Sequence, residues 1–115
     1  MQSPDGVRLR HMHDAVADAV RIVSGRSLED LFADSMVAFA VIRCLEVLGE
    51  AASKLTPETI ARFPEIPFAK MISMRNRLIH AYFDVNLSIV WSTVTEDLLP
   101  LLPALEKAIE AVEKE

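Results

Sequence analysis

Residues 74–86 read MRNRLIHAYFDVN and gather an imidazole, a carboxamide and two guanidinium groups within a few positions of one another. Asn76 and His80 are four residues apart, so a helix would place them on one face. Arg75 precedes His80 by five residues and would lie about 140° round the helix from it. A long arginine side chain can bridge that offset, so the three side chains can converge on one small anion.

Each of these side chains has a use in cleaving the phosphodiester of RNA. The imidazole of His80 can move protons near neutral pH, and the fork of Arg75 can hold a phosphate and the charge of its transition state. Asn76 can orient a partner by hydrogen bonds. The 2′-hydroxyl of RNA supplies the nucleophile, so neither a metal nor a cofactor is formally needed. No metal-ligand pattern is evident, since His11 and His13 are only two residues apart and the chain has one cysteine.

A purely structural interpretation accounts for the same residues. Cationic side chains and histidine are favoured near the C-terminus of a helix by its dipole, and Tyr82 with Phe83 can anchor a loop onto the core. The Arg-x4-His spacing is a weak pattern by itself. The residues alone therefore leave both a catalytic site and a helix-ending motif open.

The composition predicts one all-helical domain over residues 1–115. Apolar residues make up 51% of the chain, and only three glycines interrupt long periodic apolar stretches. The single cysteine excludes an internal disulfide, and no apolar stretch is long enough to cross a bilayer. We therefore expect a protein of the reducing cytoplasm that has no membrane segment.

The charge distribution permits a local site for an anion on an acidic protein. The net charge is −5, but residues 1–80 carry ten basic and ten acidic side chains, whereas residues 81–115 carry two and seven. The deficit therefore lies entirely in the C-terminal segment. From residue 67 to residue 81 every charged side chain is cationic: Lys70, Arg75 and Arg77, followed by His80.

Apolar periodicity and capping residues predict four main helices. They cover residues 7–23, about 34–54, about 67–79, and the segment that follows the capping residue Asn86. Short helical turns are expected after Ser27 and Thr56. Because the connections are short, the fold class predicted is an all-α, antiparallel four-helix bundle.

The last helix carries apolar residues at alternating steps of four and three, as in a coiled-coil seam. These are Leu87, Trp91, Val94, Leu98, Leu101, Leu105, Ala108 and Val112. Pro100 and Pro103 remove backbone donors, so the helix should bend there unless the segment splits in two. The seam is equally compatible with a core and with a dimer contact.

The central helix is apolar around most of its circumference, which predicts that it is central or shared with a second subunit. Its polar exceptions form one stripe: Arg43, Glu46, Glu50 and Lys54. A solvated, salt-linked face accounts for that stripe. No catalytic role is assigned to it.

Residues 75–82, RNRLIHAY, resemble the R-x4-H-x-Y signature of the HepT-like branch of the HEPN superfamily, including the polar residue directly after the arginine. The flanking segments resemble that family in the same order: RLRHMHDAVADAV, RCLEVLGEAASKL, FPEIPFAKMISMRNRLIHAYFDVN and IVWSTVTEDLLPLL. The resemblance covers essentially the whole chain.

The resemblance implies a HEPN bundle that dimerises so that two R-x4-H motifs line one cleft, and a metal-independent endoribonuclease activity. HepT-like members are toxins encoded beside a minimal nucleotidyltransferase antitoxin of the MntA type. Carried over, Arg75 and His80 become the catalytic pair and Asn76 a supporting residue. Tyr82 becomes the hydroxyl that the antitoxin modifies with AMP.

We therefore expect a homodimeric toxin that cleaves RNA, with Lys70 and Arg77 binding the RNA. The sequence leaves the RNA target open, with tRNA and mRNA as the candidates. The alternative is a noncatalytic helical module that binds a nucleotidyltransferase and presents a nucleotide or nucleic-acid end to it. The same basic stretch would then bind without cutting.

Overall fold

The computed structural model describes residues 3–81 and 84–114, and within them the chain is all-α with no strand. The elements in chain order are α1 (Pro4–Val23), α2 (Leu28–Ala33), α3 (Ser35–Ser53), α4 (Pro57–Arg62), α5 (Phe68–His80), α6 (Leu87–Ser92), the π-helix η1 (Thr93–Leu98) and α7 (Leu101–Glu113). The predicted helical bundle is confirmed. No helix in the described part of the chain is both long and apolar enough to span a membrane.

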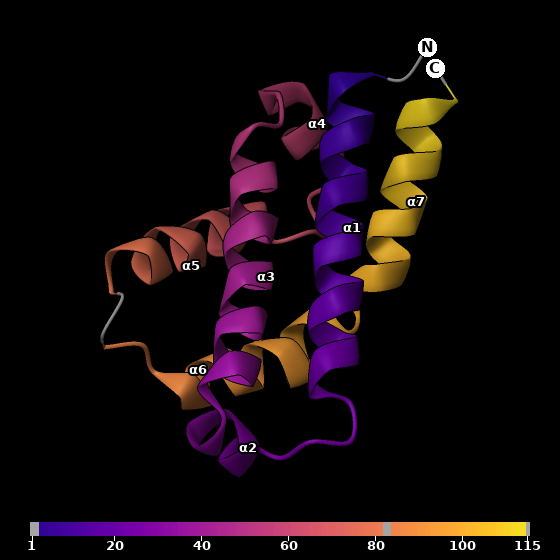
Figure 1. Cartoon of the computed structure of the whole chain (residues 1–115). Helices are drawn as coiled ribbons and strands as arrows, with labels where there is room; N and C mark the ends of the chain where they lie inside the picture. Colours follow the sequence, from indigo (N-terminus) through magenta and orange to yellow (C-terminus); the bar gives the residue numbers. More distant parts are fainter. Residues whose placement is uncertain (1–2, 82–83, 115) are drawn as a thin grey trace.

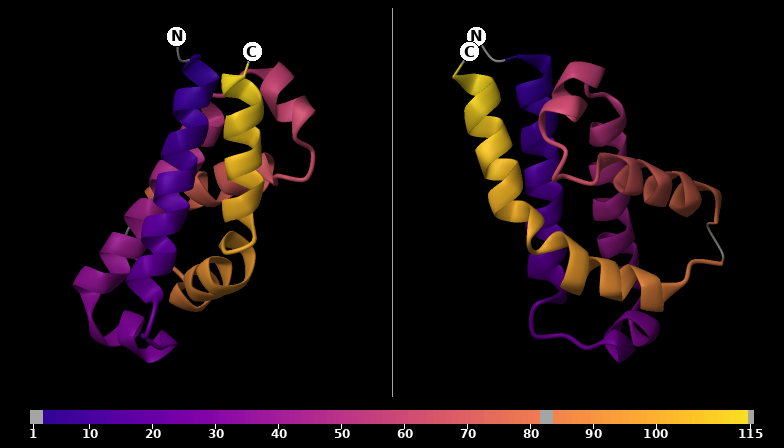
Figure 2. Two further views of the ribbon diagram at one scale, coloured as in Figure 1. Left: turned by 90° about the vertical axis from the view of Figure 1, so that its right-hand side faces the viewer. Right: turned by 180° about the vertical axis from the view of Figure 1, so that it is seen from behind.

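The long helices α1, α3 and α7 lie side by side, with α1 between the other two and running opposite to both (Figure 1). Helix α5 packs on α3 but crosses it and projects away from α1 and α7, as the view from behind also shows (Figure 2). One hydrophobic core runs through the bundle and includes residues with no exposed surface on α1 and α7, among them Leu9, Val16 and Leu105. The crossing leaves most of the surface of α5 outside this core.

Four helices begin where the sequence predicts a helix start: α2, α3, α4 and α6. Four cap side chains hold the first turn of their helix: Ser27, Asp34, Thr56 and Asn86. Helix α1 starts three residues earlier than the apolar pattern predicts. Ser3 caps it by accepting a hydrogen bond from the amide of Gly6 at 2.9 Å, and Pro4 occupies the first helical position.

The C-terminal segment, predicted to bend or split at its prolines, splits. Helix α6 continues directly into η1, a turn follows at Pro100, and α7 then begins. Pro100 has no N–H with which to continue the helix. At the junction of α6 and η1, the carbonyl oxygen of Ile89 accepts hydrogen bonds from both the hydroxyl of Thr93, at 2.7 Å, and its backbone N–H.

From Val94 to Val112 the residues of the predicted apolar seam are buried in the core of the protomer and do not form an exposed dimer contact. Ahead of Val94 the register differs: Val90 is buried, whereas Leu87 and Trp91 are only half-buried. Residues 90, 94 and 98 are spaced four apart, which suits the wider turn of a π-helix better than the alternating steps of a coiled coil.

Side-chain contacts tie both ends of the chain to the bundle. Arg10 on α1 donates from Nε to Glu113 Oε2 at 2.7 Å, which links α1 to α7. Asp5 accepts hydrogen bonds from the hydroxyls of Thr56 and Thr59 at 2.6 and 2.5 Å, which links α1 to α4. Burial opposes ionisation of the Asp5 carboxyl, but these bonds outweigh it, so its pKa is lowered.

The contact that fixes α5 on α3 is a close approach at Gly49. A Cβ atom placed on Gly49 would overlap the Cβ of Arg75 and would lie 2.5 Å from the backbone oxygen of Met71. Only a residue without a side chain lets the two helices come so near. Gly49 therefore sets how deeply α5 sits on α3.

We expect Gly49→Ala to lower the free energy of unfolding by about 1–3 kcal/mol, the usual cost of overpacking. Alanine is favoured over glycine in a helix by about 1 kcal/mol, but the clash involves the backbone of α5 and cannot be relieved by a new rotamer. Chemical denaturation followed by circular dichroism measures the change. Gly6→Ala is the matched control, because its new Cβ would meet chiefly the movable hydroxyl of Ser3 at 3.3 Å. Equal stability of wild type and Gly49→Ala would contradict the close approach.

Candidate active site

Arg75 lies where α5 crosses α3, and its guanidinium is held from both helices. Nη2 donates to Glu50 Oε2 on α3 at 2.6 Å. Nη1 donates to the side-chain oxygen of Asn76 on α5 at 2.9 Å. The side chain of Arg75 is 28% exposed, so the guanidinium is fixed while part of it still faces solvent.

His80 is the last residue of α5 and lies on the exposed side of that helix. Together with Asn76 and Arg77 it lines an open hollow of about 690 Å³, whose other lining residues are Ala69, Ile72, Ser73 and Ala81. Asn76 therefore lines the same hollow as His80 and is also bonded to Arg75. Arg75 is not among the described residues that line this hollow, and within the described residues no hydrogen bond joins it to His80. The structure therefore links Arg75 to Asn76 but does not bring its guanidinium to His80, and the expected convergence of the three side chains stays a prediction.

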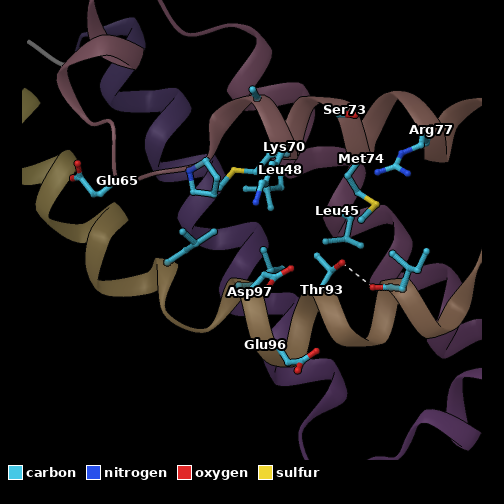
Figure 3. A pocket seen from close by; sticks show the side chains of 16 residues that line it. Leu45, Leu48, Glu65, Lys70, Ser73, Met74, Arg77, Thr93, Glu96 and Asp97 are labelled. Atoms are coloured by element: carbon cyan, nitrogen blue, oxygen red, sulfur yellow. Dashed lines mark hydrogen bonds between the residues drawn. The ribbon is translucent and has the colours of Figure 1, made fainter.

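The two cations predicted to bind RNA occupy different surroundings. Arg77 lines both the hollow that contains His80 and a larger groove of about 790 Å³ between α5 and η1. Lys70 lines the groove but not the hollow. Figure 3 shows the groove, with Glu96 and Asp97 on the wall opposite the cations. An anion in the groove would meet both signs of charge, so the hollow beside His80 is the better place for an RNA phosphate.

The polar stripe of α3 is only partly a salt-linked face of its own helix. Arg43 and Glu46 do pair, at 3.5 Å. Glu50 instead reaches the neighbouring helix and binds Arg75, a contact that sequence analysis missed. The sequence does contain a signal for this contact: Gly49 precedes Glu50 inside a predicted helix. A glycine inside a helix often marks a place where another backbone comes close.

The remaining predicted site residue, Tyr82, lies outside the described residues, two positions beyond the end of α5. In the described part of the chain, no three His, Cys, Asp or Glu side chains lie close enough together to hold a metal ion. The polar residues of the candidate site are Arg75, Asn76 and His80, together with Arg77.

Comparison with known proteins identifies the family. The sequence profile of the family described as "Ribonuclease HepT-like" matches residues 12–112. The chain belongs to the HepT-like ribonuclease family. The matched region contains every residue of the candidate site.

Curated relatives of this HepT-like chain carry ribonuclease names. A probable ribonuclease HepT of Thermococcus cleftensis is 38% identical over 96 residues, which cover 80% of this chain and 87% of that protein. A putative RNase of Methanocaldococcus jannaschii is 33% identical over 84% of this chain and 79% of its own length. A putative RNase of Caldanaerobacter subterraneus is 34% identical over 90% of this chain and 89% of its own length. No solved structure matches the chain significantly.

Proposed function

We propose that this HepT-like protein is a metal-independent endoribonuclease toxin, with Arg75 and His80 as its catalytic pair. The observation that carries the proposal is the placement of the Arg75 guanidinium on Asn76, whose side chain lines the same solvent-open hollow as His80. The ribonuclease names of the relatives support RNA as the substrate. We also propose that residues 1–115 act as one HEPN-type domain.

In the proposed reaction, a phosphate of the RNA lies between Arg75 and His80. The 2′-oxygen attacks phosphorus, and the bond from phosphorus to the 5′-oxygen breaks. His80 accepts the proton that leaves the 2′-hydroxyl and donates a proton to the departing 5′-oxygen. The N–H groups of Arg75 that are not bonded to Glu50 or Asn76 stabilise the charge on the phosphoryl oxygens. The products are a 2′,3′-cyclic phosphate and a 5′-hydroxyl. Arg77 contacts the RNA backbone at the hollow, and Lys70 contacts it from the groove.

We propose that the active form is a homodimer. Three large apolar side chains are exposed together on α2 and the first part of α3: Phe32 at 64%, Met36 at 79% and Phe39 at 65%. An exposed apolar cluster of this kind is typical of a protein interface. The cluster supports the expectation that α3 is shared with a second subunit.

We further propose control by a minimal nucleotidyltransferase antitoxin that transfers AMP to Tyr82. In the sequence Tyr82 follows two residues after His80, which is the last residue of α5. An AMP group there would add a nucleotide and a negative charge beside Arg75 and His80. Silencing would then follow from occlusion of the hollow and from pairing of the AMP phosphate with the arginine.

Arg75→Ala and His80→Ala should each reduce RNA cleavage by about 10²- to 10⁴-fold, because each removes a group that acts in the transition state. The assay uses purified, unmodified protein with total RNA and with tRNA, in the presence of a chelator, and maps the new ends. Arg43→Ala is the control, since it removes an exposed cation on α3 whose ion pair among the described residues is with Glu46. Full activity of folded His80→Ala would exclude the ribonuclease mechanism. Binding of RNA without cutting by the wild type would favour the noncatalytic module.

Phe39→Glu should convert the homodimer to a monomer, because it places a charge in the apolar cluster of α2 and α3. Phe39 is already largely exposed in one protomer, so the fold of the monomer should survive. Light scattering at micromolar concentration gives the oligomeric state. Leu99→Glu, at a position 52% exposed and outside that cluster, serves as the control. A monomeric wild type would count against the dimer.

Tyr82→Phe should keep the fold and some ribonuclease activity but escape silencing by the antitoxin, since it lacks the hydroxyl that would accept AMP. Wild type and variant are each co-expressed with a neighbouring nucleotidyltransferase, and intact mass and growth are measured. The wild type should gain mass in steps of one AMP. Equal silencing of both forms without any mass gain would point to simple binding by the antitoxin instead.

A further inference from the structure

We propose that Glu50 on α3 is a positioning residue for Arg75, which it holds in the direction needed to receive an RNA phosphate. This inference rests on the proposed ribonuclease function. Its basis is one juxtaposition: the stem of Arg75 lies against Gly49, and the guanidinium of the same side chain is bound by the next residue, Glu50, at 2.6 Å.

The contacts fix the guanidinium at two points that come from two helices. Asn76 on α5 accepts from Nη1 and Glu50 on α3 accepts from Nη2, so the plane of the guanidinium cannot turn freely. A guanidinium carries five N–H groups, and these two bonds use two of them. The others remain for a phosphate, for which the planar fork of arginine is well suited.

The position of Glu50 indicates a role in orientation rather than in stability. Its side chain is 50% exposed, and an ion pair that is this exposed contributes little to the stability of a fold. The approach of α5 to α3 is already set by Gly49. A carboxylate beside a phosphate site also repels the substrate, so its presence is best explained by what it does to Arg75.

If Glu50 orients Arg75, its removal should change the kinetics differently than if its charge merely competes with RNA for Arg75. A displacement of a catalytic group by 1 Å can cost about 10²-fold in rate. Because Arg75 acts mainly on the charge of the transition state, its misplacement should lower kcat and leave KM nearly unchanged. If Glu50 merely competed with RNA for Arg75, its removal would instead lower KM and leave or raise kcat.

The test compares Glu50→Ala with Glu50→Gln in unmodified, full-length protein acting on tRNA. Glu50→Ala should lower kcat by about 10- to 100-fold with little change in KM. Glu50→Gln should stay closer to the wild type, because its amide oxygen can still accept from Nη2. Glu46→Ala is the matched control: it removes a carboxylate one turn earlier on α3 that pairs with Arg43 and not with Arg75. It should cleave at the wild-type rate.

A second measurement does not depend on cleavage. In ¹⁵N NMR spectra without RNA, the side-chain N–H groups of Arg75 should show restricted rotation in the wild type and in Glu50→Gln, and free rotation in Glu50→Ala. If the wild type shows the restricted signals but cuts no RNA, the proposed function fails while the contact stands. If Glu50→Ala cleaves with unchanged kcat, or if its Arg75 signals match those of the wild type, the positioning role is wrong.

Discussion

The close approach of α3 and α5 at Gly49 is the constraint on which the candidate site depends. It brings the stem of Arg75 against the backbone of α3, and it does so at a residue that cannot bear a side chain without moving Met71 and the rest of α5. The guanidinium then reaches Glu50 on one side and Asn76 on the other. A small change in backbone packing would therefore move the guanidinium of Arg75, the group proposed to bind the phosphate.

Helix α5 uses its faces for different purposes. Phe68, Met71 and Leu78 are buried and anchor it to the core. Asn76 and His80 lie on the exposed side and line the hollow. Arg75 sits on the boundary, partly buried by α3 and partly in solvent, which allows a fixed side chain to remain available to a ligand. Because α5 crosses α3 instead of lying along α1 and α7, the bundle leaves this face open.

The acidic character of the chain is compatible with an RNA site because its carboxylates are mostly placed elsewhere. In α7, Glu113 pairs with Arg10 and Glu106 contacts His13, so the charges of the C-terminal segment help hold α7 to α1. Glu96 and Asp97 line the groove between α5 and η1, of which Arg75 is not a lining residue. The hollow that holds His80 has Arg77 as its only charged neighbour among its described lining residues. A surface with net negative charge can thus present a locally favourable place for phosphate.

The sequence alone determined most of the helices and several of their caps, because periodicity and first-turn hydrogen bonds act between residues three or four apart. Asn86 and Thr56 cap their helices as predicted, and Asn76 and His80 share a face because they belong to one helix. Only the tertiary structure decided the rest. The bond from Arg75 to Glu50 joins residues 25 positions apart, and the exposed cluster around Phe39 and the π-helical turn before Pro100 depend on how whole helices pack. Such contacts arise from the fit between surfaces, which no local spacing encodes.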